Sequence, residues 1–494
     1  MASHALRSED NAGASRLDLA IFACLSIFAV SIVVSKAVTE IAYGAALALW
    51  FIKVFINGRR PQQSPLTWPL LAYLMLSAIS TAFSPVPLYS WERMKSVALL
   101  IIAMLFAENV RTMRQVRVLA LLLIASTVLS LGCTAWQYSY GLGARIERDD
   151  ATLRSAGLIP GDIVVAVNGH SVHTPSAFED QIGRSDAAKP ETLQVNRGEW
   201  LEKRQVQIAA RSPALAELEQ PSAVGRAHPI RARGTLGTMV TYAEVLLQLT
   251  LVLWGLSLAA LQAQQKLSWA LAALMILTGI ALVATLTRAS LLSCFVGSVL
   301  VFWQCVPRAW ARALSLVVVL IALLGASLVV RHQRKLGMIA REDAGTDYRV
   351  LMWQDGIRLT MQHPLLGIGM DSIKVRWREY GIRAYERYPL RGHFHSTPIQ
   401  IAAERGLLTL AAWVWVIVVY LGLLLRLIKR IPQEDWFARG LVLGILGAAA
   451  GFVSSSFVHF NLGDSEVQML FWFLMGLAIA MDRVQFRSSL VQDG

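Results

Sequence analysis

Apolar runs long enough to cross a bilayer recur from one end of this chain to the other. A transmembrane helix needs about 17–25 predominantly apolar residues. Twelve runs of this kind begin near Leu17, Val38, Pro69, Val97, Val118, Tyr242, Trp269, Ala289, Leu314, Leu407, Gly440 and Val467. Hydrophobic residues make up 55% of the 494 residues and charged residues only 16%, a balance that soluble folds of this length do not have. The sequence therefore predicts an all-α integral membrane protein with about 12 transmembrane helices.

The short loops between these runs set the expected orientation, because short basic loops stay in the cytoplasm. Arginine and lysine gather in four of these loops, at residues 57–64, 111–117, 307–313 and 426–430. With twelve spans, the four loops share one side, and both termini lie in the cytoplasm. The first run follows a polar leader containing Arg7 and Arg16 and has no small-residue cleavage site after it. We therefore expect a retained span and not a signal peptide.

Two long polar segments, roughly residues 139–241 and 331–405, are then expected on the outer side of the membrane. The second segment carries thirteen Lys and Arg against eight Asp and Glu. Its charge favours either anionic lipid headgroups or a polyanionic substrate, and both interpretations stay open. The net charge of +13 does not indicate nucleic-acid binding, because the basic residues are divided between anchoring loops and outer segments.

The first outer segment has the composition of a small soluble domain. Its string LRSAGLIPGDIVVAVNGHSV, residues 153–172, resembles the PDZ family, and GLGA at residues 141–144 is similar to that family's carboxylate-binding loop. The resemblance extends over residues 141–211 and implies a small α/β PDZ-like periplasmic domain. PDZ domains bind a peptide as an added strand at a sheet edge. A peptide or protein ligand and a purely structural insert are both open.

The second outer segment ends in RGHFHSTPIQIAAERG, residues 391–406, where His395-Ser396 is followed by nine residues and then Gly406. Three other strings accompany it: LTRAS around Arg288, DYRVLMWQDGIRLTMQHPLLGIGM at residues 347–370, and HFNLGDSEVQ at residues 459–468. Together they resemble the O-antigen ligase and polymerase superfamily, integral membrane glycosyltransferases that use polyprenyl-diphosphate-linked glycans. The His-Ser-x(9)-Gly spacing is similar to that of the ligase branch. Leu407 departs slightly from that branch, in which Met, Phe or Thr is more typical after the glycine.

The resemblance implies a role for each polar residue of these strings. His395 is the expected catalytic residue, a general base that takes a proton from the acceptor hydroxyl, and histidine titrates close enough to neutral pH for this task. Guanidinium groups grip phosphate oxygens with two parallel hydrogen bonds. The residues expected to bind the diphosphate or the rest of the substrate are Arg231, Arg233, Arg288, Arg349, Lys95, His393 and Asp464. The choice between Arg231 and Arg233 stays open, and an anchor at a helix end is the alternative role for Arg288.

No metal and no cofactor are expected. His393 lacks a third Cys, Asp or Glu at ligand spacing. Asp464 and Glu466 have the spacing of a DxE metal site, but Asp464 is expected to cap the last span. The chain has no glycine-rich nucleotide loop, so the energy for the reaction is expected to come from the lipid diphosphate.

These observations predict an O-antigen ligase of the bacterial inner membrane that spans the membrane many times and whose active site faces the periplasm. It would transfer glycan from undecaprenyl diphosphate to lipid A-core, with inversion and without metal. Polysaccharide polymerisation and protein O-glycosylation are the alternatives within the superfamily. A transporter of polyanions or glycolipids is an alternative of another class, although the chain shows no paired internal repeats.

The predicted organisation has five parts. They are transmembrane helices 1–5 (1–138), the PDZ-like insert (139–225), transmembrane helices 6–9 (226–330), the large periplasmic catalytic loop (331–406), and transmembrane helices 10–12 with a cytoplasmic tail (407–494).

Overall fold

The computed structural model describes residues 2–58, 62–184, 189–197, 202–220, 223–228, 231–306, 308–310, 313, 317, 344–388 and 392–492. The chain forms two compact units, a helical unit of Met1–Val128, Ala243–Val283 and Thr287–Gly494 and a sheet unit of Leu129–Tyr242 and Ala284–Leu286. Three of the four boundaries between the units fall inside helices. The predicted span near Leu314 lies almost wholly outside the described residues.

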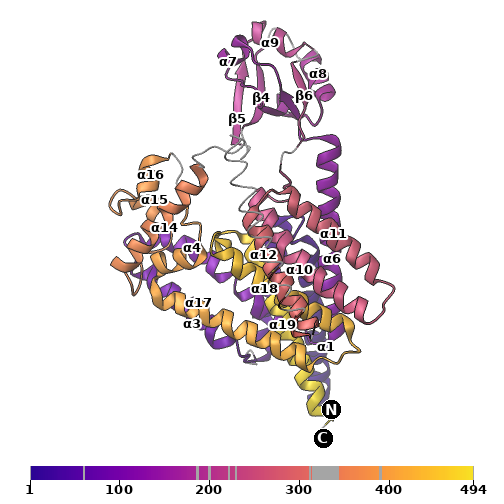
Figure 1. Ribbon diagram of the computed structural model, residues 1–494. Helices are drawn as coiled ribbons and strands as arrows, with labels where there is room; N and C mark the ends of the chain where they lie inside the picture. The colour runs from indigo at the N-terminus through magenta and orange to yellow at the C-terminus, as the bar shows by residue number, and fades with distance from the viewer. Residues whose placement is uncertain are drawn as a thin grey trace. The chain divides into compact units, whose positions relative to one another are not determined.

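Long apolar helices dominate the described part of the chain (Figure 1). Seven of them are long and apolar enough to cross a membrane, namely α2 (Lys36–Asn57), α6 (Met113–Tyr140), α10 (Met239–Gln262), α12 (Arg288–Cys305), α17 (Thr397–Arg430), α18 (Trp436–Ser456) and α19 (Ser465–Gln492). Two shorter apolar helices are α3 (Thr67–Ala82) and α11 (Ser268–Ala284). The protein is therefore a mostly helical multi-pass membrane protein with a small antiparallel sheet insert, and the total of about 12 spans stays a prediction.

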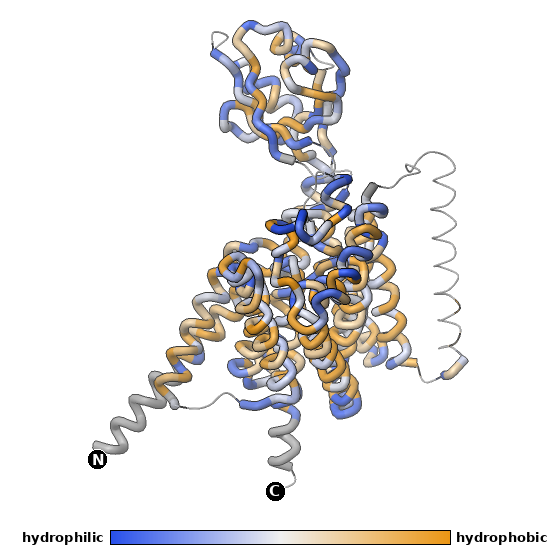
Figure 2. Tube along the Cα trace, turned by 90° about the vertical axis from the view of Figure 1, so that its left-hand side faces the viewer, coloured by the Kyte–Doolittle hydropathy of each residue, from blue (hydrophilic) through white to orange (hydrophobic). Residues whose placement is uncertain are grey.

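The remaining helices of the helical unit are shorter or more polar. They are α1 (Ala2–Ser31), α4 (Pro87–Ala98), α5 (Ile101–Asn109), α14 (Ala344–Gln362), α15 (Ser372–Arg376), α16 (Arg383–Arg387) and the 3₁₀ turn η1 (Asn461–Gly463). Within this unit, α12 packs on α18, α5 packs on α19, and α17 packs on both α3 and α14. Figure 2 shows apolar colour over most of the length of the long helices, whereas polar and apolar colours are mixed throughout the sheet unit.

The apolar run predicted to start near Val97 is not one continuous helix. It is divided between α4, which ends at Ala98, and α5, which starts at Ile101. The amides of Leu99 and Leu100 bond to carbonyls three residues back, at Ser96 and Val97, which is the tighter spacing of a 3₁₀ turn. Hydropathy alone does not distinguish such a turn from an unbroken helix.

The helix predicted to start near Leu407 begins earlier, at Thr397, so the polar string after His395 is helical and not a loop. Ser396 has an extended backbone at the N-cap position, with φ −157° and ψ 121°. Pro398 lies in the first turn, where its missing N–H leaves no helical bond unmade. Ser396 and Pro398 are typical of a helix start, but the many charged residues of the segment favour a loop when the sequence is considered alone.

The sheet unit contains six antiparallel strands among its described residues. They are β1 (Ala144–Ile146), β2 (Ile163–Val167), β3 (His170–Ser171), β4 (Glu191–Arg197), β5 (Glu202–Ile208) and β6 (Val224–Arg226), in the order β5-β4-β2-β1-β6, with β3 paired to β2. Helices α7 (Ala151–Ser155), α8 (Pro175–Arg184) and α9 (Pro213–Leu218) accompany them. Phe178, Leu158 and Leu193 are among the buried residues of its core.

The strand β6 occupies the edge of β1 within this unit. It pairs antiparallel with β1, with Val224 opposite Ile146, Gly225 opposite Arg145 and Arg226 opposite Ala144. Hydrogen bonds from Leu142 N to Ala227 O (2.7 Å) and from Ala227 N to Gly143 O (3.1 Å) extend the pairing to the predicted carboxylate-binding loop. The edge at which a peptide would add next to β1 is therefore filled by the chain itself.

Candidate active site

Two histidines, His393 and His395, lie in the segment that leads into α17. The amide of His395 donates to Nδ1 of His393 at 3.0 Å, and the two ring centroids are 4.2 Å apart. His395 has φ 51°, the left-handed conformation that non-glycine residues seldom adopt. Such strain persists only where the surroundings enforce it, and it is concentrated at functional sites.

The helix α14 holds this histidine segment in place. The indole of Trp353 donates to the carbonyl of His395 at 3.3 Å, and the ring of Tyr348 packs edge-on against the His395 ring at 5.6 Å. The hydroxyl of Tyr348 accepts a bond from the amide of Gly392. Phe394, between the two histidines, is fully buried in the apolar cluster that α14 shares with α15, α16 and α17.

A third histidine, His459, joins this region through the backbone. Its carbonyl accepts bonds from both the amide and the hydroxyl of Thr397, each at 3.1 Å, and so satisfies an N–H at the start of α17. Its Nε2 lies 3.9 Å from Oε1 of Glu244, which is 2% exposed. The Glu244 carboxylate accepts bonds from Ser290 at 2.7 Å and Ser455 at 2.6 Å, and thereby ties together α10, α12 and α18.

All three histidines are held neutral by their surroundings. Burial lowers the pKa of His393 to about 4, with a further lowering by Lys374, His459 and Arg349. Burial also lowers the pKa of His395 to about 3, and His393 and Arg349 add to the shift. The pKa of His459 is lowered to about 3, first by burial and then by Arg349 and His395. Arg349 is thus the cation that all three histidines share. The neutral His393 already uses the lone pair of its Nδ1 to accept the His395 amide.

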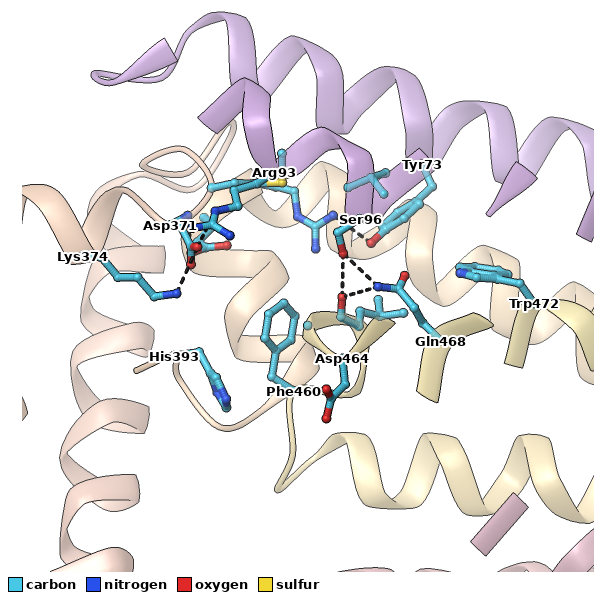
Figure 3. A pocket seen from close by; sticks show the side chains of 16 residues that line it. Tyr73, Arg93, Ser96, Asp371, Lys374, His393, Phe460, Asp464, Gln468 and Trp472 are labelled. Atoms are coloured by element: carbon cyan, nitrogen blue, oxygen red, sulfur yellow. Dashed lines mark hydrogen bonds and ion pairs between the residues drawn. The ribbon is translucent and has the colours of Figure 1, made fainter. Parts of the chain in front are cut away.

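A cavity of about 260 Å³ opens beside His393 (Figure 3). It is lined by parts of α3, α4, α15, α17, η1 and α19 and by the segments that precede α15, α17, η1 and α19. Its lining residues are Tyr73, Arg93, Ser96, Val97, Met370, Asp371, Lys374, His393, Glu404, Arg405, Phe460, Leu462, Gly463, Asp464, Gln468 and Trp472. Figure 3 shows Lys374 and His393 toward one end of the cavity and Trp472 toward the other.

Asp371 organises the charged end of the cavity. Its carboxylate forms ion pairs with Arg93 at 2.9 Å and with Lys374 at 3.0 Å. Its backbone is left-handed, with φ 54°, and its amide donates to Glu404 Oε1 at 2.7 Å. Of the two non-glycine residues with left-handed backbone in this region, Asp371 lines the cavity, whereas His395 lies behind His393 and is not a lining residue.

A kink at Gly406 turns Glu404 and Arg405 toward the cavity. Gly406 has φ 83° and ψ 168° inside α17, and a Cβ there would lie 2.0 Å from the carbonyl oxygen of Leu365. A residue with a side chain would be strained here, both by the positive φ and by the contact of its Cβ with Leu365.

The PLLGIG loop, residues 364–369, satisfies the backbone groups that the kink releases. The amide of Leu407 donates to Pro364 O at 2.7 Å, and the amides of Ile368 and Gly369 donate to the carbonyls of Ala403 and Glu404 at 3.0 and 2.8 Å. The kink and the loop therefore form one structural unit.

Residues 273–414 match the family model described as O-Antigen ligase. They form an O-antigen ligase family domain. The matched range contains Arg288, Arg349, His393 and His395, together with the kink at Gly406.

The chain is also 30% identical over 118 residues to the Exopolysaccharide production protein ExoQ of Rhizobium meliloti (strain 1021). This similarity covers 23% of the chain and 26% of that relative, so the chain aligns with only about a quarter of the relative's length.

Within the helical unit, some of the predicted site residues line the cavity and others do not. His393 and Asp464 line the cavity, and Arg349 influences the histidines from α14. Asp464 directly precedes α19, and its carbonyl accepts from Gln468 N at 3.1 Å, as expected for a residue at the start of a helix. Lys95 is exposed in the last turn of α4 and is not among the lining residues of the cavity, whereas its helix neighbour Arg93 is.

Arg288 is the first residue of α12 and is exposed. A cation at a helix N-terminus opposes the macrodipole, so helix stability does not explain its presence there.

Arg231 and Arg233 belong to the sheet unit. Arg231 Nε donates to the carbonyl of Thr285 at 2.8 Å, three residues before Arg288 in the chain. Burial and the neighbouring Arg231 both lower the pKa of Arg233. The two guanidinium groups are therefore close enough to repel each other.

Several cavity residues were not predicted from the sequence. Arg93, Asp371, Lys374 and Arg405 stand in segments of ordinary amphipathic or polar composition. Only Arg405, directly before the motif glycine, had a sequence signal. Among the described residues, no group of three or more His, Cys, Asp or Glu side chains could hold a metal ion.

Proposed function

We propose that the chain is a membrane glycosyltransferase that moves glycan from a polyprenyl diphosphate to a sugar hydroxyl, with His395 as general base. The observation that carries the proposal is the neutral, strained His395 beside a polar cavity, within the residues that match the O-antigen ligase family. Members of this family transfer glycans in ligase-type or polymerase-type reactions.

In the proposed reaction, a lone pair of the His395 imidazole takes the proton of the acceptor hydroxyl. The oxygen attacks the anomeric carbon of the donor sugar, and the bond from that carbon to the diphosphate oxygen breaks, with inversion. Because a pKa of about 3 makes His395 a weak base, binding of the anionic diphosphate has a second effect. It offsets the positive field of Arg349 and raises the basicity of the imidazole when the substrate is in place.

The departing diphosphate requires cations. Arg288 is the first candidate, because a positive charge at the N-terminus of α12 is explained by an anionic ligand and not by helix stability. Arg349, Lys95 and either Arg231 or Arg233 are further candidates. His393 and Asp464 would contact the substrate in the cavity.

Ligation of O-antigen to lipid A-core is the first candidate reaction, in a bacterial inner membrane with the site facing the periplasm. The similarity to an exopolysaccharide production protein favours a second candidate, polymerisation of an exopolysaccharide. The filled edge of β1 weakens the case that the insert recruits a polypeptide acceptor.

The test of this proposal is transfer by the purified protein supplied with undecaprenyl-diphosphate-linked glycan and lipid A-core, in EDTA and without ATP. We expect product to form, because the chain has neither metal nor nucleotide motifs. Strict dependence on Mg²⁺ or Mn²⁺ would contradict the metal-free mechanism.

A deletion strain separates the two candidate reactions. Loss of long chains from lipopolysaccharide with accumulation of lipid-linked polymer identifies a ligase. Loss of secreted polysaccharide with accumulation of single lipid-linked repeats identifies a polymerase.

A further inference from the structure

The helix α14 is apolar on two opposite faces. One face, with Met352 and Leu359, is buried in the cluster that α14 shares with α15, α16 and α17. The other face carries Val350, Ile357 and Met361, which are 39%, 55% and 76% exposed. Spacings of seven and four residues place these three side chains in one stripe along the helix. The described chain therefore leaves an apolar face of α14 exposed.

The stripe has little polar surface and continues past the end of the helix. Gln354 lies between Val350 and Ile357 on this face, and its side-chain oxygen accepts a bond from Arg383 of α16 at 3.1 Å. Leu365, three residues after the helix ends, is 65% exposed as well. A row of exposed apolar side chains marks a surface that contacts a membrane or another protein.

The end of the stripe lies beside the apolar part of α17. The amide of Leu407, where that part begins, donates to the carbonyl of Pro364 at 2.7 Å. Leu407, Leu408 and Val418 are exposed on a helix that is long and apolar enough to cross a membrane, so they face lipid. Leu365 directly follows Pro364. The stripe of α14 is therefore continuous with the lipid-facing surface of α17.

The length of that apolar part locates the edge of the bilayer core. It runs from Leu407 to the residue before Arg426, which is close to the ~20 residues that the hydrocarbon core requires. The core must therefore begin near Leu407. Leu365 lies at this boundary, and Met361 is four residues before it. A helix on a membrane surface buries its apolar face about 5–10 Å into the same zone.

We infer that α14 docks on the lipid bilayer through this stripe, with Met361 and Leu365 in the outermost acyl region and Ile357 among the headgroups. The occupant is lipid and not a second copy of the chain, because the stripe continues into a surface that already faces lipid. The bilayer surface is thus a partner of a helix that is not itself a candidate membrane span.

The docked helix also carries the contacts that hold the proposed base. Its Trp353 donates to the carbonyl of His395 at 3.3 Å, and its Tyr348 packs against the His395 ring at 5.6 Å. Docking of α14 therefore fixes the height of His395 relative to the bilayer. This step rests on the proposed function, because the diphosphate of a polyprenyl donor lies at the membrane surface where its tail enters. The bilayer then aligns the base with the donor.

The docking is tested by the accessibility of nitroxide labels in nanodiscs of phosphatidylethanolamine and phosphatidylglycerol. The labels are attached to Met361→Cys or Ile357→Cys in the full chain. Collision of a label with oxygen reports lipid, and collision with a water-soluble nickel chelate reports water. We expect Met361→Cys to respond to oxygen and Ile357→Cys to respond to both reagents. The native cysteines are first replaced by alanine, at Cys24, Cys133, Cys294 and Cys305.

Two further labels calibrate the measurement. Val418→Cys, on the exposed face of α17, is the lipid control, and Glu386→Cys, at an exposed position of α16, is the water control. If Met361→Cys responds as Glu386→Cys does, the stripe faces water and the inference is overturned. Response to neither reagent would also overturn it, because protein would then cover the stripe. Thermal unfolding checks that each labelled variant is folded.

A charge placed on the stripe tests the effect on His395. Met361→Glu should lower turnover by up to about 100-fold, the cost of misplacing a catalytic group by ~1 Å, while donor binding and thermal unfolding in detergent stay unchanged. Gln362→Glu adds the same charge at the neighbouring exposed position, off the stripe, and should transfer glycan normally.

The two measurements separate this inference from the proposed function. Full turnover by Met361→Glu would overturn the placement of His395 by the bilayer. If the unmodified protein transferred no glycan, the proposed function would fail, and a lipid response of Met361→Cys would still establish the docking of α14.

Discussion

The sheet unit and the histidine cavity differ in how fully the chain satisfies its own polar groups. In the sheet unit, β6 closes the edge of β1, and Asp162 accepts two bonds from Arg197 at 2.7 and 2.6 Å. Around the cavity, Arg405 Nε and Trp472 Nε1 have no hydrogen-bond partner among the described residues. A region whose polar groups are all paired within the chain needs no ligand to satisfy them. A region that leaves buried donors unpaired loses free energy of folding, because those groups give up their hydrogen bonds to water without replacement.

The largest expected effect comes from removing the proposed base. In His395→Ala, transfer should fall by about two to four orders of magnitude, because a positioned general base contributes that much. Binding of lipid-linked glycan should persist, since the diphosphate contacts remain. Transfer is measured by gel shift of the acceptor, and donor binding is measured in nanodiscs.

Arg288 provides the contrast for that experiment. Arg288→Ala should weaken donor binding as well as turnover, and Arg288→Lys should restore only part, because an ammonium cannot form the bidentate contact. Near-normal transfer by His395→Ala would instead point to His393 as the base.

The next largest effect is expected on stability, when the glycine at the kink of α17 is replaced. Gly406→Ala places a Cβ where Leu365 O lies and forces a positive φ on alanine, so the free energy of unfolding should fall by about 3 kcal/mol or more. Gly422→Ala in the same helix is the matched control, since no heavy atom lies within 4 Å of the added Cβ. It should stabilise by about 0.5–1 kcal/mol. Chemical unfolding in detergent measures both, and equal effects would show that the kink is not a fixed element.

Acid should destabilise the protein through the cluster formed by His393, His395 and His459. Their pKa values of about 4, 3 and 3 in the folded state lie below the ordinary value of 6.5, so the unfolded chain binds more protons at mildly acidic pH. Stability is therefore complete above pH 6.5 and declines as the pH falls from there toward about 3.

The unfolding midpoint measured from pH 7 to pH 4.5 should show this decline. In His459→Asn, the unfolding midpoint should decline less steeply with falling pH. His170→Asn, which replaces an exposed histidine of β3, is the control. An unchanged slope in His459→Asn would mean that this histidine is not held neutral.

The smallest effect is expected from removing the sheet. Replacing residues 141–226 with a short Gly/Ser linker should leave the helical unit folded, because the sheet has its own core. The replacement must include β6, since a deletion that ended at Arg211 would leave Val224 without the strand on which it is buried. Thermal unfolding and transfer activity are the measurements. Loss of transfer by a folded protein would mean that the insert takes part in catalysis or acceptor binding.

The sequence was informative where function or fold depends on local pattern. The apolar runs predicted the long helices, and the alternating strands after Gly141 predicted the insert. The spacing from His395 to Gly406 predicted a functional segment here, and the structure places that segment beside a cavity. The identity of His395 as the base remains a prediction.

The cavity itself could not be predicted, because it is assembled from segments about 280 to 370 residues apart in the chain. Arg93 meets Asp371, and Ser96 meets Gln468, only through the packing of α4 against the segment that precedes α15 and against the first turn of α19. The role of Pro364, Gly367 and Gly369 was equally hidden. These residues form the loop that completes the backbone bonding of a kinked helix, which has no signature in periodicity.

The position of β6 also has a consequence for the order of synthesis. Val224 follows Ile146 by almost eighty residues, so β1 is made long before the strand that closes its edge. At about 5–20 residues per second, that edge stays open for roughly 4–16 s on each nascent chain. An unpaired edge is a template for association with other chains. The newly made insert therefore passes through a short period with an unpaired strand edge, which closes when the chain turns back toward the membrane.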